Sequence, residues 1–215
     1  MRFDSTRGLY SYCDVILLRY VITSTRVLGY LLVMHQTATH SELRTSTSLG
    51  SSHAVGNQAD VLQRILNHGV NLSLWQRPAQ QAITQELLPL EAGQLPDVRC
   101  RTSPASFDAD LCVLLTKHDL DPLNFEQWRI DLGGVAERFV GISKGREVTL
   151  RLETTATDGC RRFHIDHTHL RLLCTYRGPG TEWLPEGQVD RVAQANGAPN
   201  RGIVRFGNPS HNNED

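Results

Sequence analysis

The sequence lacks the features that mark several large classes of protein. Among its 215 residues, Lys and Arg total 22 and Asp and Glu total 23, so no excess charge draws the chain to nucleic acid or to an anionic membrane. The five cysteines are scattered and include no C-x-x-C pair, which argues against a disulfide framework and against a structural zinc knuckle. No internal repeat is present. We therefore expect a cytoplasmic protein with reduced thiols, whose partner is a small molecule or another protein.

A long uninterrupted apolar run is also missing. Residues 15–34 are the most apolar stretch, but Arg19, Arg26 and several Ser, Thr and Gly residues interrupt them, whereas a membrane-spanning helix needs about 20 apolar residues in a row. No unbroken apolar region precedes a signal-peptide cleavage site. We expect no stable membrane span, and we expect residues 1–56 to be a poorly ordered extension and linker, with Met34 as an alternative start of translation.

Regular structure is predicted from about residue 57. Apolar residues at helical spacing predict a helix that ends near Gly69, a second over residues 79–91 and a third over 107–120. Asp121-Pro122 is a typical helix start, and the helix that follows is expected to reach Phe139, with a break or kink at Gly133-Gly134. Alternation in "VNLSLWQRP" predicts a strand among these helices, and "DVRCRTS", residues 97–103, reads as a second, short strand.

The second half of the chain is different, because apolar residues there alternate with polar ones. Residues 145–156 and 169–178 read as strands, and "RGIVRFG", residues 201–207, as the opening of another. The predicted fold class is α+β: residues 57–207 form one domain, whose helical N-terminal half packs on an antiparallel sheet. Residues 208–215 are expected to be a disordered tail.

The most specific motif is "FHIDHTHLRLLCTYRGPGTEWLP", residues 163–185. On an extended backbone residues i and i+2 point to the same side, so His164 and Asp166 can reach one cation. His167 and His169 have the opposite parity and are second choices as ligands. The pattern H-x-D is common, and the alternative is that these residues are the hydrogen-bonded polar end of a strand.

After that motif comes a strand, a turn at Gly178-Pro179-Gly180 and then Thr181-Glu182-Trp183. The order resembles the middle of the double-stranded β-helix oxygenases that use iron(II) and 2-oxoglutarate. The resemblance implies a jelly-roll-like sheet and a divalent metal bound by His164 and Asp166. Iron(II) and zinc both suit a histidine and a carboxylate.

Residues 57–207, and above all the motif, also resemble a bacterial family classed as a domain of unknown function, whose genes lie near zinc-responsive genes. In that family further strands carry a distal histidine, so the resemblance implies that this copy is C-terminally truncated, with an incomplete sheet and a weakened metal site. Open sheet edges would favour self-association.

Other side chains of the motif are expected to assist the site. Among four arginines (Arg161, Arg162, Arg171 and Arg177), Arg177 is the best candidate to bind a co-substrate carboxylate. Glu182 and Tyr176 are expected to support the site, and Cys174 to pack in the core. Three functional hypotheses remain: an oxygenase-like enzyme of unknown substrate, a non-catalytic metal-binding accessory of zinc homeostasis, and an inactive truncated homologue.

Overall fold

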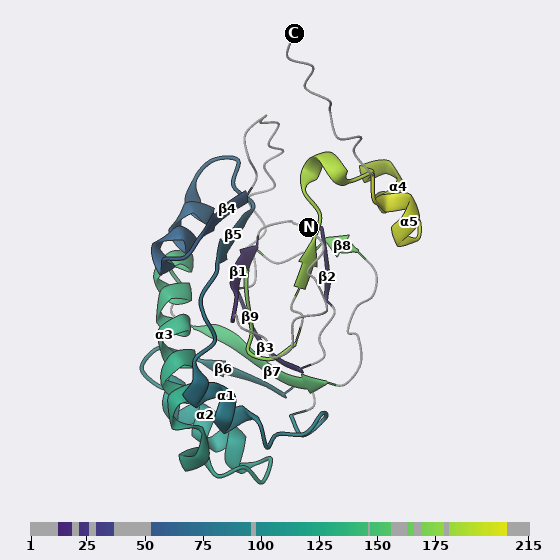
Figure 1. Ribbon diagram of the computed structural model, residues 1–215. Helices are drawn as coiled ribbons and strands as arrows, with labels where there is room; N and C mark the ends of the chain where they lie inside the picture. Colours follow the sequence, from purple (N-terminus) through teal and green to yellow (C-terminus); the bar gives the residue numbers. More distant parts are fainter. Residues whose placement is uncertain are drawn as a thin grey trace.

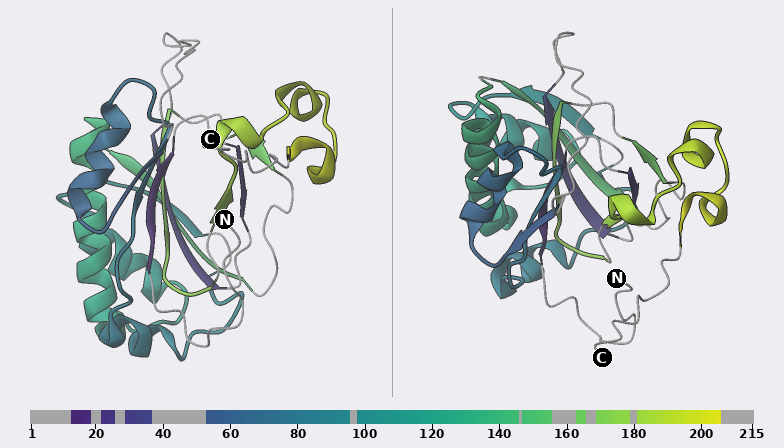
Figure 2. Two further views of the ribbon diagram at one scale, coloured as in Figure 1. Left: turned by 45° about the horizontal axis from the view of Figure 1, so that its top comes forward. Right: turned by 90° about the horizontal axis from the view of Figure 1, so that it is seen from above.

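A computed structural model describes the following residues: 13–18, 22–25, 29–36, 53–95, 98–145, 147–155, 163–165, 169–178 and 181–205. They form a layer of helices, a large sheet and a small sheet, in that order (Figures 1 and 2). The prediction of an α+β fold is therefore confirmed at this level. The two sheets form no closed barrel in the described part of the chain.

The large sheet has seven strands in the order β4-β5-β1-β9-β3-β7-β6. Their bounds are β1 Val15–Leu18, β3 Gly29–Gln36, β4 His53–Gly56, β5 Leu72–Trp75, β6 Val98–Thr102, β7 Val148–Thr155 and β9 Leu170–Thr175. β4 pairs with β5 in parallel, and all other neighbours in this sheet are antiparallel. The sheet is therefore mixed rather than purely antiparallel.

Strands from the N-terminal segment occupy central places in this sheet. β1 lies between β5 and β9, and β3 lies between β9 and β7. We expected a poorly ordered extension and linker over residues 1–56, and four strands begin within that range. The polar interruptions at Arg19 and Arg26, which argued against a membrane helix, fall in the sequence between strands.

Five helical segments cover one face of the large sheet (Figure 1). They are η1 Ala59–Leu66, α1 Gln81–Leu87, α2 Phe107–Thr116, η2 Pro122–Phe125 and α3 Glu126–Ser143. Trp128 and Phe139 on α3 are buried in the core between the layers, as are Leu150 and Leu172 on the strands. α3 continues through Gly133-Gly134, so the predicted break there is wrong.

The Asp121-Pro122 pair starts the 3₁₀ turn η2, and the long helix α3 follows from Glu126. Asp121 accepts a hydrogen bond from the backbone N–H of Leu123, and Pro122 occupies the first turn, as the Asp-Pro pair predicts. The segment near residue 60 is a 3₁₀-helix whose Leu66 is 50% exposed, although the apolar spacing placed Leu66 on the buried face. The tighter 3₁₀ winding turns that position away from the core.

The small sheet lies on the other face of the large sheet (Figure 2). Its three antiparallel strands are β2 Ile22–Thr25, β8 His164–Ile165 and β10 Thr181–Trp183, in the order β10-β2-β8. The chain alternates between the sheets, since β7 and β9 belong to the large sheet and β8 and β10 to the small one. Such alternation between two facing sheets is also a feature of jelly rolls.

Short helical segments follow the last strand and lie beyond the small sheet (Figure 2). They are η3 Glu186–Gln188, α4 Arg191–Ala195 and α5 Asn200–Ile203. The predicted strand over 201–207 is wrong in its first half, because Asn200–Ile203 is helical and only Val204 makes an isolated bridge, to Val189. Residues 206–215, including the predicted tail, lie outside the described residues.

No described helix has the length and apolarity needed to cross a membrane.

Starting the chain at Met34 tests whether the N-terminal strands belong to the fold. This deletion removes β1, β2 and the first five residues of β3, so backbone groups along both edges of β9 lose their partners. We expect the shortened protein to be insoluble or unfolded, measured by soluble yield and circular dichroism. Full-length Met34→Leu is the control, because this swap of buried residues conserves volume and should cost less than about 1.5 kcal/mol. A shortened chain that unfolds cooperatively at the full-length temperature would contradict the assignment.

Candidate functional site between the sheets

The orientation of His164 follows from the register of the small sheet. Thr23 is paired with Trp183 on one side and with His164 on the other, so Trp183 and His164 stand in one row across the sheet. Side chains of residues directly opposite each other project to the same face of a sheet. Trp183 packs against an apolar cluster of the large sheet, made of Ile16, Leu72, Leu74 and Leu173. His164 therefore faces the space between the two sheets.

The strand that carries His164 is held in place at its start. Just before β8, the backbone N–H of Phe163 donates a hydrogen bond of 2.9 Å to Oδ1 of Asn200. The Phe163 ring packs with Val189 and Ile203 in a small separate cluster. The C-terminal helical segments thus anchor this two-residue strand, which is too short to be stable by its own pairing.

Across the space, β9 presents polar groups on either side of an apolar centre. Leu173 contacts the cluster around Trp183, and by the two-residue period of a strand Arg171 and Thr175 share its face. Arg171 is half-buried and is the second residue of β9, directly after the segment that leads from β8. The guanidinium group of Arg171 thus lies near the start of β9, where the chain enters this strand after β8.

Thr181 adds a hydroxyl group on the small-sheet side. It shares the parity of Trp183 on β10, is 7% exposed, and its Oγ1 has no hydrogen-bond partner among the described residues. A buried hydroxyl usually has a partner. The face of the small sheet that is turned to the large sheet therefore carries an imidazole, an indole and a hydroxyl.

The predicted ligand set is only partly within the described residues. His164 is placed as above, whereas Asp166 and His167 lie outside the described residues. His169 is half-buried and immediately precedes β9. The described residues contain no group of three His, Cys, Asp or Glu side chains that could hold a metal.

The predicted supporting residues are not brought together. Arg177 is exposed beyond the end of β9, and Glu182 is exposed on the face of β10 opposite to that of Trp183. Tyr176 is buried on the helical side of the large sheet, where it contacts α3. Arg161 and Arg162 lie outside the described residues, and of the two remaining candidates Arg171 rather than Arg177 faces the space between the sheets.

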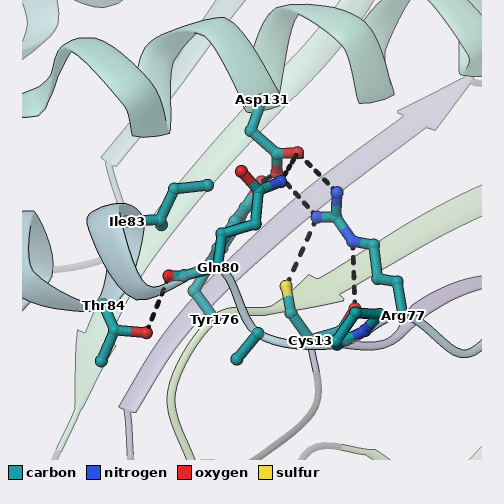
Figure 3. Close-up of a pocket in the computed structure, with 9 residues that line it drawn as sticks. Cys13, Arg77, Gln80, Ile83, Thr84, Asp131 and Tyr176 are labelled. Carbon is teal, nitrogen blue, oxygen red and sulfur yellow. Dashed lines mark hydrogen bonds and ion pairs between the residues drawn. The ribbon is translucent and has the colours of Figure 1, made fainter.

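Tyr176 belongs instead to a buried polar cluster that the sequence did not reveal (Figure 3). Arg77, two residues after β5, donates two hydrogen bonds to Asp131 on α3, from Nη1 to Oδ1 at 2.5 Å and from Nη2 to Oδ2 at 2.7 Å. The Tyr176 hydroxyl donates to Asp131 Oδ2 at 2.6 Å. Nε of Arg77 donates to the backbone oxygen of Cys13 at 3.0 Å. One guanidinium group thus links α3 to the N-terminal segment.

Aromatic rings complete the surroundings of Arg77. Its Cζ lies 4.9 Å from the centre of the Trp75 ring and 5.8 Å from that of Tyr176, distances at which a cation is attracted to a ring. Burial lowers the pKa of Arg77, but nearby Cys174 and the hydrogen bond to Asp131 outweigh it and raise the pKa above its usual value. Burial also raises the pKa of Tyr176 well above its usual value. The cluster is therefore a fixed ion pair with a neutral phenol beside it.

The charges of Arg77 and Asp131 neutralise each other, so we interpret this cluster as stabilising the fold rather than as a reaction site. The hollow beside it is lined by Cys13, Arg77, Asp131 and Tyr176 among others, and has room for about one water molecule. One sequence signal could have indicated the cluster. Asp131 lies between Trp128 and Val135 on the buried side of α3, and a buried carboxylate needs a cationic partner.

A second carboxylate has an unusual environment on the other face of the large sheet. Cys13 and Val15 belong to the core on the helical side and Ile16 to the cluster between the sheets, so Asp14 also faces the space between the sheets. Burial raises the pKa of Asp14 from 3.8 to about 6, and the charge of Arg77 opposes that rise. Its Oδ1 is buried without a hydrogen-bond partner among the described residues.

A protein-family model described as "Protein of unknown function (DUF1826)" matches residues 56–212. The match begins at Gly56, the last residue of β4, so β1, β2 and β3 lie wholly outside it. No curated protein and no solved structure matches the chain.

Breaking the Arg77–Asp131 pair should be strongly destabilising. Asp131→Asn leaves a guanidinium group that is 9% exposed without its counter-charge, which we expect to lower the free energy of unfolding by about 3 kcal/mol in urea denaturation. Arg101→Gln is the control, because it breaks a pair whose side chains are 79% and 60% exposed and should cost less than about 1 kcal/mol. Equal losses in the two variants would show that burial of the Asp131 pair has no energetic importance.

Asp14 should make the stability fall as the pH rises. Its folded pKa of about 6 exceeds the usual 3.8, so its destabilising effect is absent below about pH 4 and develops between pH 4 and 6. Since the group is partly exposed, we expect Asp14→Asn to stabilise the protein at pH 7.5 by about 1 to 2 kcal/mol and to have little effect at pH 4. Thermal unfolding at the two pH values measures this, with the exposed Glu137→Gln as control. A gain that is equal at both pH values would contradict the raised pKa.

Proposed function

We propose that this chain, which belongs to the DUF1826 family, binds a divalent metal ion between its two sheets through His164 and Asp166. We further propose that it is an enzyme of the iron(II)- and 2-oxoglutarate-dependent type, built on a double-stranded β-helix. The observation that supports the proposal is that Trp183 and His164 are both paired with Thr23. Their side chains therefore project to the same face of the small sheet, and Trp183 packs on the large sheet.

The types of side chain fit a divalent metal. A neutral imidazole and a carboxylate supply two of the three ligands of a facial triad, which leaves positions open for substrate. His169 is our first choice for a third ligand among the described residues, because the segment that returns from β8 to β9 ends there. His167 is the alternative. Iron(II) bound there would supply the oxygen chemistry.

Residues around this site have separate roles in the proposal. Trp183 packs against Leu173, and this apolar surface would limit water at the site and strengthen electrostatic contacts there. Arg171 binds the carboxylate of an anionic co-substrate, a role for which its half-buried position suits it better than the exposed Arg177. The Thr181 hydroxyl offers a hydrogen bond to a bound molecule.

Metal content of the purified full chain tests the binding step. We expect the wild-type protein to retain about one equivalent of iron or zinc and the His164→Ala, Asp166→Ala double variant to retain little, as measured by elemental analysis. His118→Ala is the matched control, since His118 lies beside α2 on the helical side of the large sheet. Equal and negligible metal in wild type and double variant would reject metal binding.

Turnover then separates an enzyme from a metal-binding accessory. With iron(II) and oxygen, we expect 2-oxoglutarate to be consumed by the wild-type protein, and Arg171→Gln to raise the co-substrate concentration needed far more than Arg177→Gln does. Metal retained without any turnover would instead support the second candidate, a non-catalytic accessory of zinc homeostasis. The same two ligands suit zinc, so the ligand types alone do not distinguish these roles.

A further inference from the structure

Two cysteines from distant parts of the chain are in contact on the helical side of the large sheet. Sγ of Cys13 and Sγ of Cys174 are 3.6 Å apart, although 161 positions separate them in the sequence. In the pairing of β1 with β9, Cys174 lies opposite Val15, and Cys13 comes two residues before Val15 in the chain. Both thiols are buried, with Cys13 5% exposed and Cys174 fully buried.

The guanidinium group of Arg77 lies beside both sulfur atoms. Its Nη2 donates to Sγ of Cys13 and to Sγ of Cys174, each at 3.4 Å. Burial raises the pKa of Cys174, but the hydrogen bond from Cys13 and the charge of Arg77 outweigh it and leave the pKa below its usual value. The hydrogen bond with Cys174 and burial raise the pKa of Cys13. One thiol of the pair is therefore favoured as a thiolate, which is the reactive form.

Solvent reaches the pair from one side. Cys13 lines the hollow beside Arg77 and Tyr176, which has room for about one water molecule (Figure 3). Hydrogen peroxide is little larger than water, whereas bulky oxidants would be excluded. Cys13 is therefore the member of the pair that a small oxidant meets first.

We propose that Cys13 and Cys174 form a disulfide bond when the protein is exposed to hydrogen peroxide, and that this bond ties β1 covalently to β9. The two sulfur atoms must approach by about 1.5 Å to reach the usual bond length of about 2.05 Å. Cys13 lies two residues before the start of β1, so the movement falls outside the strand.

The reaction balances with peroxide as the only oxidant. The Cys174 thiolate takes the proton of Cys13 as Sγ of Cys13 attacks one peroxide oxygen; an S–O bond forms, the O–O bond breaks and hydroxide leaves. That hydroxide takes the proton of Cys174, and the Cys174 thiolate then attacks Sγ of Cys13. The S–S bond forms as the S–O bond breaks, and the second oxygen leaves as hydroxide, which is protonated to water. Two thiols lose two electrons, and peroxide is reduced to two waters.

The bond would act on the same strand that follows the H-x-D segment. It would close a loop from residue 13 to residue 174, and cross-links over long loops restrict the unfolded chain most. It would also fix the N-terminal segment to the family-matched part of the chain. The inference is independent of the metal site.

The test uses the full chain, treated with a small excess of hydrogen peroxide under native conditions and then alkylated. We expect mass spectrometry of the digest to show a peptide pair joined through Cys13 and Cys174, reversed by dithiothreitol, and thermal unfolding to shift to higher temperature before reduction. Cys112→Ser is the control, because its half-buried thiol is outside the pair and the cross-link should persist. Cys13→Ser should lose both the cross-link and the shift in unfolding temperature.

Two outcomes would overturn the proposal. One is that Cys13 and Cys174 are alkylated as free thiols after treatment while the half-buried thiols of Cys100 and Cys112 are oxidised. The other is that the cysteines form sulfinic acids without any joined peptide. Because both are read on the wild-type protein, the test stands even if a cysteine variant fails to fold.

Discussion

The backbone pairing of β9 with two strands from the N-terminal segment is the constraint on which the rest of the structure depends. β9 donates and accepts ladder hydrogen bonds toward β1 on one side and β3 on the other, so a strand of the motif has no exposed edge. Every buried backbone N–H and C=O needs a partner, and here the partners come from more than 130 positions away in the sequence. The position of the motif in space is therefore decided by a segment outside the matched family region.

That strand serves both faces of the sheet at once. Cys174, and Tyr176 just beyond the strand, face the helices and join the cluster around Arg77 and Asp131, whereas Arg171 and Leu173 face the small sheet and the imidazole of His164. Residues that are adjacent in the motif thus belong to two separate environments. A side chain such as Tyr176 is rigidly held, but on the side away from the proposed metal.

The Arg77–Asp131 pair connects these environments. Arg77, which follows β5, is hydrogen-bonded to Asp131 on α3 and to the backbone oxygen of Cys13, which precedes β1. One guanidinium group therefore links β5, α3 and β1. Its charges are compensated, and the two thiols beside it are the reactive groups of that region. The cluster therefore combines a structural ion pair with a redox-active neighbour, and both act on the placement of the N-terminal strand.

The sequence by itself determined the local features of this protein. The Asp121-Pro122 helix start and the alternation in β7 and β9 follow from interactions over a few residues, and the α+β class follows from them. The same-side placement of residues two apart on a strand is the local rule from which His164 and Asp166 were predicted to act together. Only the tertiary structure decided that the interrupted apolar stretch over residues 15–34 contributes three strands to the two sheets. It also decided that His164 faces the large sheet, and that Arg171 rather than Arg177 faces the small sheet. These outcomes depend on pairings between segments more than 100 positions apart, and a local pattern contains no information about which distant backbone will satisfy its hydrogen bonds.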